Sequence, residues 1–182
     1  GGISPGECCA TPHLTNWAIC LLPFVEQQPL YDRYDQSRTN EDPANAFVRE
    51  QIVDSYGCPS DRHATKLERP ESGPGSTLNY RHGSYRCVAG SHWDERNQVR
   101  STGYSWNIPG QSGGTFTTSP RLAGIYHKVR PNHSSQIGQA EKMSSITDGT
   151  SNTFAFGEQY APETTRRGTF WAYTYTTYNA SG

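Results

Sequence analysis

The feature that most constrains the fold is a long polar stretch, residues 62–139, in which apolar residues occur only as short islands. The chain contains 18 glycines and 12 prolines, and clusters such as Ser72-Gly73-Pro74-Gly75 predict turns within this stretch. Because structureless segments of such length are rare in compact domains, we expect several short strands there. We therefore predict one domain over residues 1–182, with residues 62–140 as a loop-rich insertion.

The remaining sequence predicts an α+β fold, in which an N-terminal helical segment packs on a mostly antiparallel sheet. Only 32% of the residues are apolar, but 11 tyrosines, 4 tryptophans and 6 phenylalanines can fill an aromatic core. Residues 15–22 have helical periodicity, with Thr15 or Asn16 as the N-cap and a break expected at Pro23. Further short helices are expected to begin at Pro29 and at Asp42-Pro43.

Three segments are predicted to be strands: residues 52–56, 153–156 and 169–178. The last of these, TFWAYTYTTY, is rich in aromatic and β-branched residues, which favour a pleated surface. Both of its faces carry bulky side chains, so it is expected either to be covered on both sides or to lie at a subunit contact. The candidates for self-association are Phe170, Trp171, Tyr173 and Tyr175.

Charge and hydropathy argue against nucleic acid as a partner and against a membrane span. Net charge is −1, and the 16 basic residues are scattered, so the basic surface that nucleic acid requires is not indicated. No window approaches 18 apolar residues, so no membrane span is predicted in this chain.

The five cysteines, Cys8, Cys9, Cys20, Cys58 and Cys87, match no zinc module. Several disulfide connectivities are possible, and the predicted bonds are Cys58–Cys87 and a bond from Cys20 to Cys8 or Cys9. Disulfides, three lysines and one methionine favour an extracellular or cell-surface protein. The alternative is a cytosolic protein with buried free thiols.

The segment ITDGTSNTFAFGE, residues 146–158, is the strongest candidate for a metal loop. Oxygens at alternate positions, together with a later carboxylate, suggest calcium, and the four candidate ligands are Asp148, Thr150, Asn152 and Glu158. However, an EF-hand loop needs Gly at its sixth position and Glu at its twelfth, and this segment has neither. The favoured interpretation is a structural turn, in which Ser151 and Asn152 bond to the backbone. No other cofactor is predicted.

Catalytic motifs are weak. The six histidines form no metal-binding pair in the sequence, and the G-x-S-x-G pattern at residues 110–114 lacks the strand-to-helix context of a nucleophile elbow. We therefore predict that the protein is not an enzyme.

Three motifs, in order along the chain, resemble a very large planctomycete family of unknown function, domain of unknown function 1559. They are WAICLLPFVEQQPLY at residues 17–31, YGCPSD at residues 56–61 and ITDGTSNT at residues 146–153. Asn79-Tyr80 and Gly157-Glu158 match the family as well. The resemblance implies a pilin-like protein, in which a prepilin-type signal and a hydrophobic helix precede a globular α+β head.

This chain differs from the pattern in two respects, since the hydrophobic helix and the family's closing His…Asp-Gly motif are missing. We expect either a trimmed mature form or part of a longer chain. The resemblance lends no catalytic residue. It implies an extracellular, non-enzymatic subunit that self-assembles into a filament, tube or surface layer. The alternative is a cell-surface module that binds carbohydrate or another ligand through Trp93, Tyr104 and Trp106.

Overall fold

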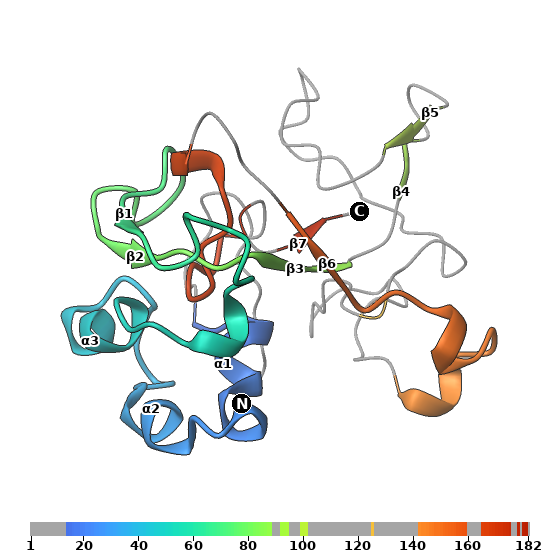
Figure 1. Cartoon of the computed structure of the whole chain (residues 1–182), viewed down its shortest axis with the longest axis horizontal. Coiled ribbons are helices and arrows are strands. Elements are labelled where there is room, and N and C mark those ends of the chain that lie inside the picture. Colours follow the sequence, from blue (N-terminus) through green and yellow to red (C-terminus); the bar gives the residue numbers. More distant parts are fainter. Residues whose placement is uncertain are drawn as a thin grey trace. The chain divides into compact units, whose positions relative to one another are not determined.

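The computed structural model describes residues 14–88, 92–94, 99–101, 125, 142–159, 165–175, 178 and 180–181. The chain divides into two compact units (Figure 1). The first comprises Gly1–Arg86 and Glu158–Asn179, and the second comprises Cys87–Gly157 and Ala180–Gly182. A single pilin-like head with an insertion at residues 62–140 stays a prediction.

The first unit begins with two short α-helices, α1 (Trp17–Leu21) and α2 (Gln28–Arg33), with a 3-10 helix, Leu22–Val25, between them. Asn16 is the N-cap of α1, since its side-chain oxygen accepts a hydrogen bond from the Ile19 N–H over 2.9 Å. The predicted break at Pro23 is confirmed by the change from α to 3-10 geometry. Pro29 lies in the first turn of α2, as predicted.

The third helical region combines a 3-10 helix, Pro43–Asn45, with α3 (Ala46–Arg49). Asp42 caps it by accepting a hydrogen bond from the Ala44 N–H, which confirms the predicted start. The strand predicted at residues 52–56 is wrong, because Asp54–Tyr56 is another 3-10 helix. Its helical hydrogen bonds are those of a 3-10 turn: the Tyr56 N–H donates to the Val53 carbonyl, and the Gly57 N–H donates to the Asp54 carbonyl.

Several short strands lie within the polar stretch, as predicted. In the first unit, β1 (Leu67–Glu68) pairs antiparallel with β2 (Tyr80–Arg81). In the second unit, β4 (His92–Asp94) pairs antiparallel with β5 (Val99–Ser101).

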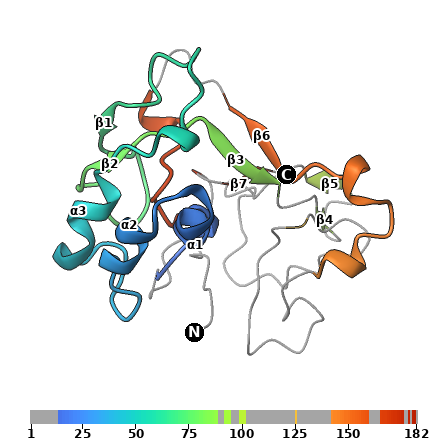
Figure 2. The same cartoon turned by 60° about the horizontal axis from the view of Figure 1, so that its bottom comes forward.

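A further sheet has the strand order β6-β3-β7, and Figure 2 shows its three strands side by side. These strands are β3 (Tyr85–Val88), β6 (Phe156–Glu158) and β7 (Ala180–Ser181). The pairing of β3 with β7 is parallel, with Cys87 opposite Ala180. The mixture of short helices and small sheets agrees with the predicted α+β class.

The C-terminal aromatic segment is not the strand that its composition predicts. Phe170 forms one isolated bridge with His82, and a turn follows in which the Tyr173 N–H donates to the Phe170 carbonyl. A turn allows bulky side chains on both sides of the segment to enter the interior, whereas an exposed strand would leave one side in water. Packing therefore overrides the local β preference.

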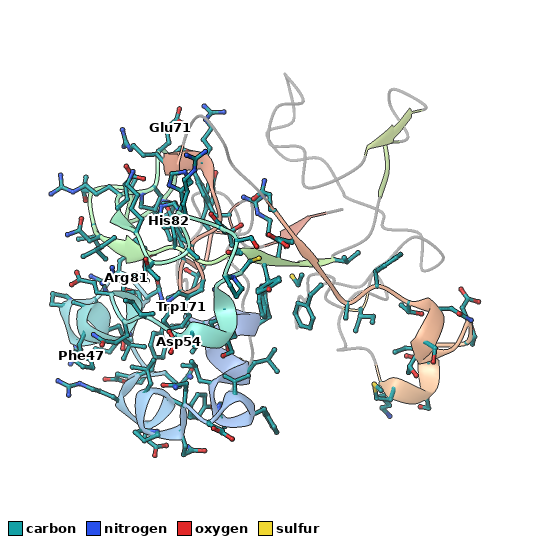
Figure 3. All side chains as sticks on the ribbon, viewed as in Figure 1. Phe47, Asp54, Glu71, Arg81, His82 and Trp171 are labelled. Carbon is teal, nitrogen blue, oxygen red and sulfur yellow. The ribbon has the colours of Figure 1, made fainter. Side chains whose placement is uncertain are left out.

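The core of the first unit joins this segment to the helices. It contains Ala18, Ile19, Leu22, Leu30, Tyr34, Val48, Val53, Tyr56, Trp171 and Ala172. The Trp171 indole N–H donates to the Gln51 carbonyl over 3.0 Å, so its polar atom is satisfied inside the core. Figure 3 shows Trp171 among the side chains of this unit and Phe47 at its margin.

The helices of the described residues are all too short, or too polar, to cross a membrane.

Candidate functional site

The segment ITDGTSNT closes on itself as a turn. Gly149 has a positive φ of 86°, and a 3-10 helix, Thr150–Asn152, follows it. The Asn152 amide donates to the Asp148 carbonyl, and the Thr153 hydroxyl donates to the Gly149 carbonyl, each over 3.0 Å. The hydrogen bond from the Asn152 side chain to the backbone is the one expected if this segment is a structural turn.

The calcium hypothesis gains no support from this geometry. Its four proposed ligands, Asp148, Thr150, Asn152 and Glu158, are all exposed to solvent. Within the ranges that the structure describes, no three His, Cys, Asp or Glu side chains gather in a way that could hold a metal ion. A calcium site built largely on neutral oxygens stays a prediction.

The predicted Cys58–Cys87 disulfide is not formed in this structure, because Cys58 carries a free thiol. A hydrogen bond to a residue distant in the sequence holds the Cys58 backbone. Its N–H donates to Ser84 Oγ over 2.9 Å. Burial raises the pKa of Tyr85, and the nearby Cys58 thiol raises it further.

The second predicted disulfide is not formed either, since Cys20 is a free thiol. Cys20 Sγ lies 3.7 Å from Thr15 Oγ1, and burial raises the pKa of the thiol. Its proposed partners, Cys8 and Cys9, lie outside the described residues.

The four candidates for self-association are buried within the first unit. The exposed fractions are 0% for Phe170, 1% for Trp171, 0% for Tyr173 and 6% for Tyr175. These rings pack against others of the same unit. For example, the centroids of Tyr173 and Tyr80 are 4.6 Å apart. Of the two alternatives for this segment, coverage on both sides is the one observed. The prediction that these four residues form a self-association contact is corrected, because they are core residues of the first unit.

A glycine-containing loop, residues 72–78, lies over this aromatic group. The Tyr173 hydroxyl lies within hydrogen-bond distance of two carbonyl oxygens, those of Ser72 (2.9 Å) and Pro74 (2.6 Å), and shares its one proton between them. Gly73 has φ +98°, and a Cβ there would lie 2.5 Å from the same hydroxyl. The loop can approach the tyrosines this closely only because glycine occupies that position.

Beneath the loop lies a buried polar cluster around Tyr80 and Arg49. Arg49 is 3% exposed, and its Nη1 donates to the carbonyls of Asn40 (2.7 Å) and Asp42 (2.9 Å). Its guanidinium carbon lies 5.4 Å from the centre of the Tyr80 ring. Burial raises the pKa of Tyr80, and the charge of Glu41 raises it further.

A second buried polar pair joins β1 to the end of β2. His82 Nε2 lies 3.4 Å from Glu68 Oε2, and the His82 ring packs on Phe170 with 4.1 Å between centroids. Burial lowers the pKa of His82 to about 4, although Glu68 acts in the opposite direction. The imidazole is therefore neutral near pH 7, and it is held too deeply to act as a surface acid or base.

Large apolar side chains are exposed in both units. Phe24 in the first unit is 81% exposed, while Met143 and Phe154 in the second are 74% and 82% exposed. Phe24 follows the predicted break at Pro23 and lies in the 3-10 helix Leu22–Val25. Phe154 was expected in a strand, yet β6 begins two residues later.

The remaining candidates from the sequence are the aromatic residues proposed to bind carbohydrate and the G-x-S-x-G segment. The side chain of Trp93, and all of Tyr104, Trp106 and the G-x-S-x-G segment, lie outside the described residues. Binding of surface polysaccharide through these aromatic residues stays a prediction.

A family model, SBP_bac_10, described as a protein of unknown function (DUF1559), matches residues 1–181. No curated protein and no solved structure matches the chain.

Proposed function

Because this chain belongs to the DUF1559 family of proteins of unknown function, we propose a function from its own surface and from the pilin-like character that its motifs imply. The proposal is an extracellular, non-enzymatic subunit that assembles with copies of itself into a filament, tube or surface layer. Extracellular placement follows from the resemblance to exported pilin-like proteins.

The observation that carries the proposal is the exposure of Phe24 and Phe154. At 81% and 82% exposure, each ring leaves most of its apolar area in water. Covering apolar surface stabilises by roughly 25 cal/mol per Å², so contact with another copy would be favourable at either ring. Since the two rings belong to different units, each unit offers its own apolar contact.

The strand β6 supplies a second mode of contact. It stands at one end of the order β6-β3-β7, and all three of its residues are exposed. A strand at the edge of a sheet can accept a strand from another chain through backbone hydrogen bonds. Phe154, just before β6, would add apolar contact beside that edge.

Side-chain hydrogen bonds join distant segments of the first unit, and a subunit that assembles needs such a defined structure. Arg81 Nε donates to the Glu50 carbonyl over 2.9 Å, and its Nη1 donates to the Thr65 carbonyl over 2.7 Å. Arg86 Nε donates to Thr169 Oγ1 over 3.0 Å. Residues held in this way lose little conformational entropy on assembly, because these hydrogen bonds already fix them in the described part of the first unit.

The test compares Phe24→Ser and Phe154→Ser with the unchanged protein by light scattering and negative-stain electron microscopy. Phe47→Ser is the matched control, because the Arg33 guanidinium already covers that ring at 3.9 Å. We expect the first two changes to reduce the assembled fraction and the control to leave it unchanged. If all three variants assembled like the parent, these rings would not be the contacts.

A further inference from the structure

Among the buried polar atoms of the first unit that lack a hydrogen-bond partner within the described part of the chain, four belong to side chains around Arg49 and Tyr80. They are Asn40 Oδ1, Glu41 Oε1, Arg49 Nε and Tyr80 Oη. Asn40 and Tyr80 are both 0% exposed, so bulk solvent does not reach their side chains. Leaving such groups unsatisfied in a protein interior is unfavourable, and native structures rarely do so.

The contacts place these groups together. Arg49 bonds to the Asn40 carbonyl and lies over the Tyr80 ring. The point that a Cβ on Gly75 would occupy is 2.6 Å from the Tyr80 hydroxyl and 2.9 Å from Glu41 Cγ, so these two side chains meet beneath the loop. The Asn40 amide nitrogen donates a hydrogen bond to the Ala172 carbonyl, which anchors Asn40 to the C-terminal aromatic segment.

The chemistry of the cluster selects a neutral ligand. Arg49 contributes a positive charge and an N–H donor, while Glu41 contributes a negative charge and an acceptor. They form no direct ion pair in the described structure, so Arg49 Nε and Glu41 Oε1 each still lack a hydrogen-bond partner. A cation would be repelled by the guanidinium, and an anion would be repelled by the carboxylate.

We propose that this cluster is an internal binding site for water, closed by the loop of residues 72–78. Water is neutral, both donates and accepts, and fits spaces too small for other ligands. A buried water makes about three hydrogen bonds, so about two molecules would satisfy the cluster. They would join Arg49 to Glu41 and Tyr80, and would couple the loop to α3.

The test is magnetic relaxation dispersion of water oxygen-17 in the full chain, which detects internal water with a long residence time. We expect a dispersion in the unchanged protein and a smaller amplitude in Tyr80→Phe, which removes one hydroxyl partner. Tyr31→Phe is the matched control and should keep the full amplitude. Equal amplitudes in the parent and Tyr80→Phe would overturn the proposal.

Urea denaturation provides an independent measurement. If water satisfies the Tyr80 hydroxyl, Tyr80→Phe lowers the unfolding midpoint, because a bonded group is lost. If the hydroxyl has no partner, the same change raises the midpoint, and the proposal fails. A thermal shift on adding calcium that Glu41→Gln abolishes would also overturn it, because the ligand would then be a cation.

Discussion

The side-chain amide of Asn16 donates a hydrogen bond to the carbonyl oxygen of Trp171 over 2.8 Å, and so joins two residues 155 positions apart. The same nitrogen lies 3.1 Å from the Tyr173 carbonyl, while the amide oxygen caps α1. One buried side chain therefore fixes both the start of the first helix and the C-terminal aromatic segment. This contact couples the helices to the core that they cover.

Asn16→Ala is expected to destabilise the protein by about 3 kcal/mol. It removes an N-cap, which contributes about 1 kcal/mol, and leaves buried carbonyls without a donor, which costs about 1–3 kcal/mol. Asn152→Ala is the matched control. Its amide makes one bond in an exposed turn, so we expect a loss below about 1 kcal/mol. Urea denaturation followed by circular dichroism measures both, and equal losses would contradict the role of Asn16.

Gly73→Ala should destabilise the loop over the tyrosines. Its positive φ is unfavourable for alanine by about 1–2 kcal/mol, and the new Cβ would strike the Tyr173 hydroxyl. Gly157→Ala is the control, because nothing lies within 4 Å of a Cβ at that position. Thermal unfolding should show a lower Tm for Gly73→Ala alone. Similar Tm values for the two variants would show that the loop tolerates the added methyl group.

Stability should fall as the pH is lowered from about 6.5 to about 4, in part through His82. Its pKa is about 4 when folded, below the ordinary value of 6.5, so the unfolded chain binds the proton more tightly. The contribution that neutral His82 makes to the free energy of unfolding is complete above pH 6.5 and is lost as the pH falls toward 4. The shift corresponds to a loss on the order of 3 kcal/mol.

The measurement compares urea unfolding of the parent with His82→Gln between pH 7 and pH 4. Groups that do not contact His82 contribute equally in both proteins, so the difference between the two curves reports the histidine together with its interaction with Glu68. We expect the variant to depend less steeply on pH over this range. Parallel curves would contradict a buried neutral His82.

Replacement of a buried ring and of an exposed ring should show which of the two contributes to the stability of the fold. Trp171→Ala removes a ring that is 1% exposed, and should cost about 3–5 kcal/mol. Phe24→Ala changes a ring that is 81% exposed, and should alter stability by no more than about 0.5 kcal/mol. Denaturation of the two variants measures this contrast. A large loss for Phe24→Ala would mean that the ring packs in the folded chain.

The parts of the fold that depend on local chemistry could be predicted from the sequence. Asn16 and Asp42 have short side chains that cap helices, and Pro23 and Pro29 mark where helical geometry changes or begins. Gly149 and Asn152 likewise form the turn that their residue types favour. Each of these effects operates within a few residues.

The parts that depend on distant contacts could not be predicted. Aromatic density in residues 169–178 indicates a strand, but the choice of a buried turn depends on Asn16 and His82, which are far away in the sequence. The cluster of Arg49 with Tyr80 has no sequence signature, because its members are separated by about 30 residues and share no spacing rule.

The most direct test of the central claim is light scattering of the unmodified protein over a range of concentrations, beside negative-stain electron microscopy of the same samples. If the protein is a self-assembling subunit, the mean mass rises with concentration and the images show regular filaments, tubes or sheets. A mass that stays at 20.2 kDa at every concentration, with no ordered assembly in the images, would contradict the proposal.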